Sequence, residues 1–326
     1  LGQQLDAAGT SGEEPLLFGT THMATTLMSM TRYEEGWQKA QEARQLAERL
    51  GNRKYLAETL TQPYVDYHIS KGDLAAARKA AEEGLEIAVP IGAAVAEFQG
   101  LSQLALIARW QGAYDEALAH LADLERLSQN FPAPGFRLPQ LAQLAGVTLE
   151  ISEELIERSL AYQAEALKIL AVSTISFNSL AWAEIAFCRL IAGDLQAADT
   201  YLQKGLATRD SYMYFVRPSL LTGQALLALA RENLPQAKGH IAEARAFIEE
   251  RGMQSHAPFI ALVEGRISAA AGKREVALEQ FARTESLARE MGMLPTVWQA
   301  QAAAARELYG GSQTAEAQEM RLRALA

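Results

Sequence analysis

The sequence has little of several features that would point to a particular class of protein. It contains one cysteine in 326 residues, Cys188, so a disulfide within the chain is impossible. Aromatic residues make up only 7% of the chain, which argues against a β-sandwich because strands favour aromatic and β-branched side chains. No uninterrupted apolar run reaches the roughly 20 residues that a transmembrane helix needs. We therefore expect a protein that does not enter a membrane.

Positive charge is also scarce, and the formal net charge is −9 at pH 7. Nucleic-acid binding depends on neutralising phosphates with Lys and Arg, so an acidic chain without a basic tract is a poor candidate for it. Residues 1–15 lack the basic start and apolar stretch of a signal peptide, which favours a cytoplasmic location. Because the chain does not begin with Met, we expect it to be part of a longer protein or a trimmed one.

Residues that carry catalytic or metal chemistry are few and scattered. The histidines lie far apart, without metal-ligand spacing, and we expect surface or capping roles for them: His22, His68, His120, His240 and His256. Cys188 lies in an apolar stretch and is predicted to be a buried small hydrophobe. No phosphate-binding loop or basic helix-turn-helix occurs. The sequence therefore predicts no enzyme, no cofactor and no metal.

What the sequence does contain is a repeat. Hydrophobic residues make up 49% of the chain, mostly Ala and Leu, a bias that suits closely packed helices. Helical stretches are interrupted by short breaks in which Gly or Asn can end a helix and Asp or Ser can cap the next one. These breaks are centred on residues 30–33, 71–74, 111–114, 192–195, 232–234, 271–273 and 310–312.

Small side chains give the register of the repeat. A first column contains Ala24, Val65, Ala105, Ala186, Ala225, Gly265 and Ala305. Successive units are 39 to 41 residues apart, and the gap from Ala105 to Ala186 corresponds to two units of about 40. Twelve positions after each lies a second small residue, at Gly36, Ala77, Ala117, Ala198, Ala237, Ala277 and Ala317. Helix backbones approach closely only where side chains are small, so these columns predict antiparallel helix pairs. We expect an all-α fold with about eight such pairs.

The fourth unit, at about residues 130–172, is irregular. Ala145 or Gly146 fits the first column, but Glu157 or Arg158 falls in the second. Residues 130–135 contain two prolines and are predicted to form a loop. We interpret this unit as an irregular repeat and residues 14–326 as one solenoid after a segment at 1–13. A boundary between two separate domains is the alternative.

The breaks resemble the start of the second helix in tetratricopeptide repeats. The stretches concerned are Gly72-Asp73-Leu74-Ala75-Ala76-Ala77, Gly112-Ala113-Tyr114-Asp115-Glu116-Ala117 and Gly193-Asp194-Leu195-Gln196-Ala197-Ala198. Trp182 also falls where that family often has a Trp. The period of about 40 is similar to the longer repeats of maltose-regulon and LuxR-type transcription activators, large bacterial signalling ATPases and nucleotide cyclases. This resemblance implies a right-handed superhelix that acts as a sensor or scaffold arm.

In that family the first helix of each pair lines a concave binding surface. Carrying its exposed positions over by register gives the candidate ligand-binding residues Thr59, Gln62, Asp66, Gln99, Arg109, Phe187, Thr222, Arg266 and Arg306. The N-terminal half of this surface is polar and the middle apolar, which suits a peptide or helix laid along the groove. The alternative is that the apolar middle is core between repeats, because a one-residue register error rotates a helix by about 100°.

Two classes of function remain open. The first is a non-catalytic scaffold that binds a protein, a peptide or another domain of its parent chain, in signalling or transcription regulation. The second is a sensor for a small-molecule effector, stacked on aromatic side chains from the set Tyr64, Tyr67, Trp110, Trp182 and Trp298. Those aromatic residues are also typical of an ordinary helical core.

Overall fold

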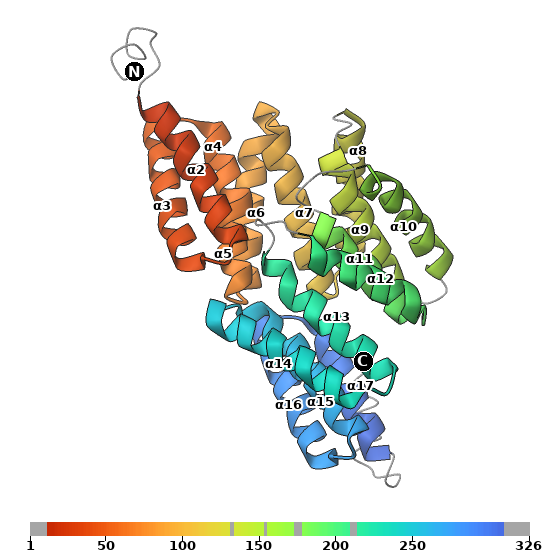
Figure 1. The fold of residues 1–326 in the computed structure, drawn as a ribbon. Coiled ribbons are helices and arrows are strands. Elements are labelled where there is room, and N and C mark those ends of the chain that lie inside the picture. The colour runs from red at the N-terminus through yellow and green to blue at the C-terminus, as the bar shows by residue number, and fades with distance from the viewer. Residues whose placement is uncertain (1–11, 131–133, 153–154, 173–177, 209–213, 310–326) are drawn as a thin grey trace.

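The computed structural model describes residues 12–130, 134–152, 155–172, 178–208 and 214–309. Within these ranges the fold is all-α, with 15 helices packed as antiparallel pairs in a tetratricopeptide-like solenoid (Figure 1). The fold class predicted from the sequence is thus confirmed. None of the described helices is both long and apolar enough to cross a membrane.

Each pair consists of a first and a second helix. The first three pairs are α2 (Glu13–Ser29) with α3 (Tyr33–Leu50), α4 (Arg53–Thr59) and α5 (Val65–Ser70) with α6 (Leu74–Ile91), and α7 (Ala94–Gln111) with α8 (Tyr114–Asn130). The next two are α9 (Pro134–Ile151) with α10 (Ile156–Leu170) and α11 (Asn178–Ile191) with α12 (Leu195–Ala207). The last two are α13 (Arg217–Ala230) with α14 (Leu234–Arg251) and α15 (Ala257–Ala270) with α16 (Arg274–Met291). Helix α17 (Leu294–Tyr309) follows, and its expected partner lies outside the described residues.

One first helix contains an irregularity that the sequence pattern did not predict. Helices α4 (Arg53–Thr59) and α5 (Val65–Ser70) are joined by a π-helical turn, Leu60–Tyr64, which contains Pro63. Proline lacks a backbone N–H and cannot make the usual helical hydrogen bond, so a wider turn accommodates it without ending the helix. We therefore count α4, this turn and α5 as one first helix.

The predicted breaks within the described residues end and start helices as expected, with two local differences, whereas the break at 310–312 lies outside them. Gly72 has φ 76° and ends α5, and the Asp73 carboxylate then accepts a hydrogen bond from the Ala76 N–H at 2.9 Å. In two other breaks the left-handed residue is not Gly or Asn but Thr31 (φ 59°) and Glu232 (φ 58°). Asn233 instead caps the N-terminus of α14, because Asn is a favoured helix cap.

The described residues of the two small columns are buried, as close packing within each pair requires. The first-column alanines and Val65 are all at most 5% exposed, and the described second-column alanines are fully buried. A methyl group on Gly265 would come within 2.4 Å of the Phe281 ring. Ala317 lies outside the described residues. The repeat therefore follows directly from where helices approach one another.

The irregular fourth unit corrects one detail of the register. Its second-column residue is neither Glu157 nor Arg158 but Ser159, which is fully buried and donates a hydrogen bond to the Ala145 carbonyl at 2.8 Å. The small positions Ala145 and Ser159 of the pair α9–α10 are thus 14 residues apart, instead of the 12 found in the other pairs. Pro134 and Gly135 also lie in the first turn of α9 rather than in a loop, since proline is well tolerated at a helix N-terminus. Residues 131–133 lie outside the described ranges.

First helices form the inner layer of the solenoid. Each packs on the next first helix along the series α7, α9, α11, α13, α15 and α17, while second helices pack mainly on first helices. In a curved solenoid, the helices that pack most closely from one unit to the next lie on the concave side. We refer to the surface of these first helices as the inner surface, in line with what the resemblance implies.

The last units fold back against the first ones. One core contains Leu60 and Leu74 together with Met293 and Val297, and another contains Tyr33 together with Met253. In Figure 1, α14 and α15 accordingly lie beneath the ends of α3 and α5. Through these contacts, the N-terminal and C-terminal halves of the chain share parts of their hydrophobic core.

Candidate binding surface

We call the residues that directly follow each first-column position, with Ala145 as that position in the fourth unit, the inner column. It has one residue per unit. Its members are Thr25, Asp66, Leu106, Gly146, Phe187, Leu226, Arg266 and Arg306. Six of them are half-buried, Gly146 is buried and Arg306 is exposed. The adjacent first-column residues face the second helices and are buried. The inner column therefore follows the part of the first helices that solvent reaches.

At the N-terminal end, polar side chains bond across neighbouring first helices. The Gln99 amide donates to the Gln62 carbonyl oxygen, and Thr61 Oγ1 donates to Gln99 Oε1 at 3.3 Å. The Gln103 amide donates to the Asp66 carboxylate at 2.8 Å. The predicted residues Gln62, Asp66 and Gln99 are thus brought together, and each already has a partner from the adjacent unit.

Asp66 is the acidic member of the inner column. Burial raises the pKa of its carboxyl to about 7, although the hydrogen bond from Gln103 acts in the opposite direction. The cause is the cost of removing a carboxylate from water without a cation to pair with it. Near neutral pH the Asp66 carboxyl is therefore only partly ionised.

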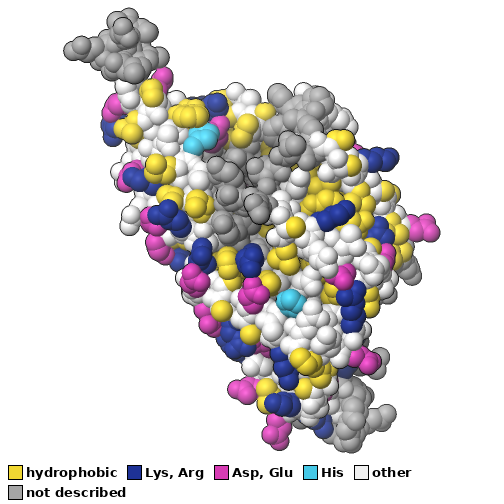
Figure 2. Space-filling model, in the orientation of Figure 1, with side chains coloured by type: hydrophobic (Ala, Val, Ile, Leu, Met, Phe, Trp, Pro, Cys, Tyr) yellow, Lys and Arg dark blue, Asp and Glu magenta, His cyan; other side chains and the backbone are white. Residues whose placement is uncertain are grey.

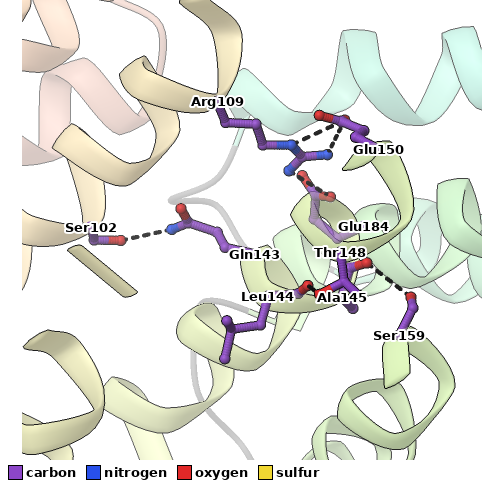
Figure 3. Close-up of polar contacts among 9 residues, drawn as sticks. All are labelled: Ser102, Arg109, Gln143, Leu144, Ala145, Thr148, Glu150, Ser159 and Glu184. Atoms are coloured by element: carbon purple, nitrogen blue, oxygen red, sulfur yellow. Dashed lines mark hydrogen bonds and ion pairs between the residues drawn. The ribbon is translucent and has the colours of Figure 1, made fainter. Parts of the chain in front are cut away.

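Arg109 links three successive first helices (Figure 3). Its guanidinium donates to Glu150 of α9 at 2.6 and 3.0 Å and to Glu184 of α11 at 3.1 Å. Burial by itself lowers the pKa of Arg109, but the two carboxylates outweigh it and the net pKa is raised. Arg109 was predicted to contact a ligand, and the structure places it in an ion-pair network of the chain itself.

Gly146 is the glycine that makes room for this network. A Cβ at Gly146 would come within 2.6 Å of Arg109 Nη2 and 2.7 Å of Glu184 Oε2. The guanidinium from the third unit thus fills the inner-column position of the fourth. Sequence reasoning missed Glu150 and Glu184, although each faces Arg109 from a position about one or two repeats further along the chain.

The middle of the inner column is apolar. Leu106, Phe187 and Leu226 are half-buried, whereas the neighbouring Ala183 is core, at 3% exposure. Phe187 Cζ lies 3.6 Å from where a Cβ would stand on Gly223 of the next first helix. The apolar middle therefore contains both core residues and partly accessible ones.

The described C-terminal end of the inner column is cationic. Arg266 of α15 is half-buried and Arg306 of α17 is exposed, on adjacent first helices. Burial lowers the pKa of Arg266, and the charge of Arg306 lowers it further. Neither guanidinium has a hydrogen-bond or ion-pair partner within the described residues. This end of the surface can accept an anion.

Two other predicted residues are enclosed by their own chain. Thr59 is fully buried, and its Oγ1 has no hydrogen-bond partner among the described residues. Thr222 is 6% exposed and donates to the Pro218 carbonyl at 2.7 Å. Both lie on first helices, but neither presents more than a small side-chain surface in this conformation.

The aromatic residues considered for a small molecule mostly pack on other side chains. Tyr67 stacks on Trp37, with ring centres 4.4 Å apart, and Trp182 stacks on Tyr201 at 5.4 Å. Tyr64 also contacts Trp37, and Trp110 contacts Phe259 across the two halves of the chain. Trp298 alone among the five is more than one-third exposed. Their packing fits a structural role.

Reactive side chains are spread out or buried. No group of three or more His, Cys, Asp or Glu residues suited to a metal occurs in the ranges that the structure describes. Cys188 is 1% exposed, and burial raises the pKa of its thiol to about 12, so it is an inert hydrophobe as predicted. His256 was expected to have a surface or capping role. It is instead partly buried, and this burial lowers the pKa of its imidazole to about 4.

A shallow depression lies where the first and last units meet. It has a volume of about 390 Å³ and is lined by Thr31, Arg32, Tyr33, Glu34, Glu35, Lys71, Glu249, Glu250, Arg251 and Gly252. Lys71 pairs with Glu34 at 2.7 Å, and Arg251 donates to Thr31 at 3.0 Å across the contact. Figure 2 shows positive and negative side chains interspersed along this edge, which does not resemble a basic nucleic-acid surface.

Comparison with known proteins shows similarity in fold alone. No family model and no curated protein matches the chain. Among solved structures, a Rap protein in complex with competence and sporulation factor is similar over 96% of this chain and 97% of its own, with a TM-score of 0.64 and 11% identity. The type IV pilus biogenesis factor PilW covers 71% of this chain and 93% of its own, at TM-score 0.44 and 17% identity. A tetratricopeptide repeat protein from Parabacteroides merdae covers 86% and 98%, at TM-score 0.44 and 13% identity.

Proposed function

We propose that this chain is a non-catalytic scaffold that binds a protein or peptide partner along the inner surface of its first helices. The observation that carries the proposal is the inner column, in which partly accessible Leu106, Phe187 and Leu226 are followed by Arg266 and Arg306. These two arginines have no ion-pair partner in the part of the chain that the structure describes. Apolar anchors with a few flanking charges are typical of peptide and helix recognition in a groove.

The Rap structure supports the proposal by showing that a repeat fold of this extent has been solved with a bound factor. The contact between the two ends of the chain adds a second support, because it surrounds the inner surface from both halves. On these grounds we treat residues 14–326 as one binding unit. Membership in a larger signalling or regulatory protein follows from the sequence resemblance alone.

A random 12-residue peptide library displayed on phage tests the proposal. We expect peptides selected on the native chain to lose binding to Phe187→Gln and Leu226→Gln and to keep binding to Val276→Gln. Val276 is a matched control, because it is an exposed apolar residue on second helix α16, at 43% exposure. Peptides that bind all three variants equally well would place the binding surface elsewhere.

A separate screen tests the small-molecule alternative. A metabolite library screened by thermal shift detects binding because a ligand at 100 times its dissociation constant adds about 2.7 kcal/mol of stability. A metabolite that stabilises the chain and whose effect depends on Trp298, with no peptide selected, would favour an effector sensor instead.

A further inference from the structure

Arg266 and Arg306 occupy equivalent positions in successive units. Each directly follows a first-column residue, Gly265 or Ala305, and their helices α15 and α17 pack on each other. Equivalent positions on adjacent first helices lie side by side on the inner surface. The two guanidinium groups are therefore presented together rather than on separate faces.

The acidic residues nearest in sequence do not neutralise this pair. Glu264 forms an ion pair with Arg245 of α14 and also interacts with Arg283 of α16, so its carboxylate faces the second helices. Glu307 follows Arg306 and is rotated by about 100° around the helix. By contrast, Arg109 faces the same interior with two carboxylates around it.

Two neighbouring cations, one of them half-buried, are unfavourable without an anion, because desolvation and like-charge repulsion both disfavour the charged form. These are the two effects that lower the pKa of Arg266. Arginine guanidinium groups bind carboxylates and phosphates through paired N–H donors. Among the described residues, the local arrangement is therefore that of an anion site in which the protein supplies only the positive charges.

We propose that Arg266 and Arg306 form an anion-binding site that takes a carboxylate of the peptide partner, so that an acidic residue of that partner lies beside Arg266 while apolar residues lie towards Leu226 and Phe187. This proposal rests on the proposed function, since it assigns chemistry to one end of the same surface. A free oxyanion offers the same chemistry, and the experiment separates the two sources.

The first measurement uses the purified chain without any partner. Calorimetric titration at constant ionic strength compares acetylated, amidated hexaglutamate with hexaglutamine and with inorganic phosphate. We expect hexaglutamate to bind, hexaglutamine not to bind, and Arg266→Met or Arg306→Met to weaken hexaglutamate binding about tenfold or more, as for loss of a charge-assisted hydrogen bond. Arg53→Met is the matched control, being an exposed arginine on α4. Binding of phosphate alone, or equal binding to all variants, would overturn the proposal.

Thermal stability in chloride buffer separates a ligand site from a structural role. Methionine keeps the apolar stem of Arg266 and removes its charge, so we expect Arg266→Met to melt at the same or a higher temperature than the native chain. A large fall in melting temperature would mean that Arg266 stabilises the fold and would contradict the assignment. Library peptides that depend on Phe187 but not on Arg266 would refute this site and leave the proposed function intact. If hexaglutamate binds in a way that depends on the arginines but no library peptide is selected, the anion site is supported and the proposed function is refuted.

Discussion

The guanidinium of Arg109 lies over Gly146, so close that a methyl group there would come within 2.6 Å of Nη2. The side chain of Arg109, from the third unit, thus occupies the inner-column position of the fourth unit. The arrangement joins α7, α9 and α11 through Glu150 and Glu184 and holds the irregular fourth unit in line with its neighbours. These ion pairs therefore connect the fourth unit to both the third and the fifth.

Substituting Gly146 tests this close approach. We expect Gly146→Ala to lower the free energy of unfolding by about 1–3 kcal/mol, the usual cost of overpacking, because the methyl group displaces Arg109. The control is Gly239→Ala on α14, where a Cβ would meet nothing within 4 Å. That change is expected to stabilise the chain by about 0.5–1 kcal/mol through helix propensity. Chemical denaturation measures both, and equal effects would contradict the packing described here.

Removing the cation of the network also has a substantial expected effect. Arg109→Met leaves the partly buried carboxylates of Glu150 and Glu184 without a counter-charge, and charged groups that lose a hydrogen-bond partner in this way cost about 1–3 kcal/mol or more. Arg32→Met, which removes a solvent-exposed pair with Glu35, is expected to change the melting temperature little. Calorimetry of the two variants makes the comparison. A small effect at Arg109 would mean that the network contributes little to the fold.

Asp66 is expected to make stability depend on pH. Its folded pKa of about 7 is raised above the ordinary value of 3.8, so the folded state holds the proton more tightly than the unfolded state does. This contribution is fully present below about pH 4 and is lost as the pH rises towards 7, at up to about 1.4 kcal/mol per pH unit.

The variant Asp66→Asn isolates that contribution, because the amide oxygen can still accept the hydrogen bond from Gln103. We expect the variant to be more stable than the native chain at pH 8 and similar to it at pH 4. Denaturant melts across this range give the difference. A constant difference between the two proteins from pH 4 to 8 would show that Asp66 is ionised throughout.

Contact between the two ends of the chain can be tested at Met293. This side chain is 1% exposed, in a core shared with Leu74 of the second unit. Met293→Ala is expected to cost about 2–5 kcal/mol, as for other large-to-small core changes, and to speed amide exchange around residues 71–74. Leu294→Ala, at a 43% exposed neighbour, is the control. Unchanged exchange at residues 71–74 would argue that the ends do not pack on each other.

The repeat could be predicted from the sequence because small residues recur wherever a helix pair closes, and a side chain larger than Val65 would not fit there. The π turn at Pro63 could not, because proline at that position is equally compatible with a helix end. Asp66 and Arg109 were placed on the inner surface by register alone, as were Arg266 and Arg306. Their partners could not be predicted. Gln103, which bonds Asp66, and Glu150 and Glu184, which pair with Arg109, come from other units, and their orientation depends on how the helices stack.

The most direct test of the account is the affinity of one library-selected peptide for the native chain, Phe187→Gln, Arg266→Met and Val276→Gln, measured by calorimetric titration. We predict that the first two variants bind at least about tenfold more weakly than the native chain, as expected when an anchor worth about 1.4 kcal/mol is removed. The Val276 variant should bind like the native chain. Equal affinity for all four proteins would contradict binding along the inner surface.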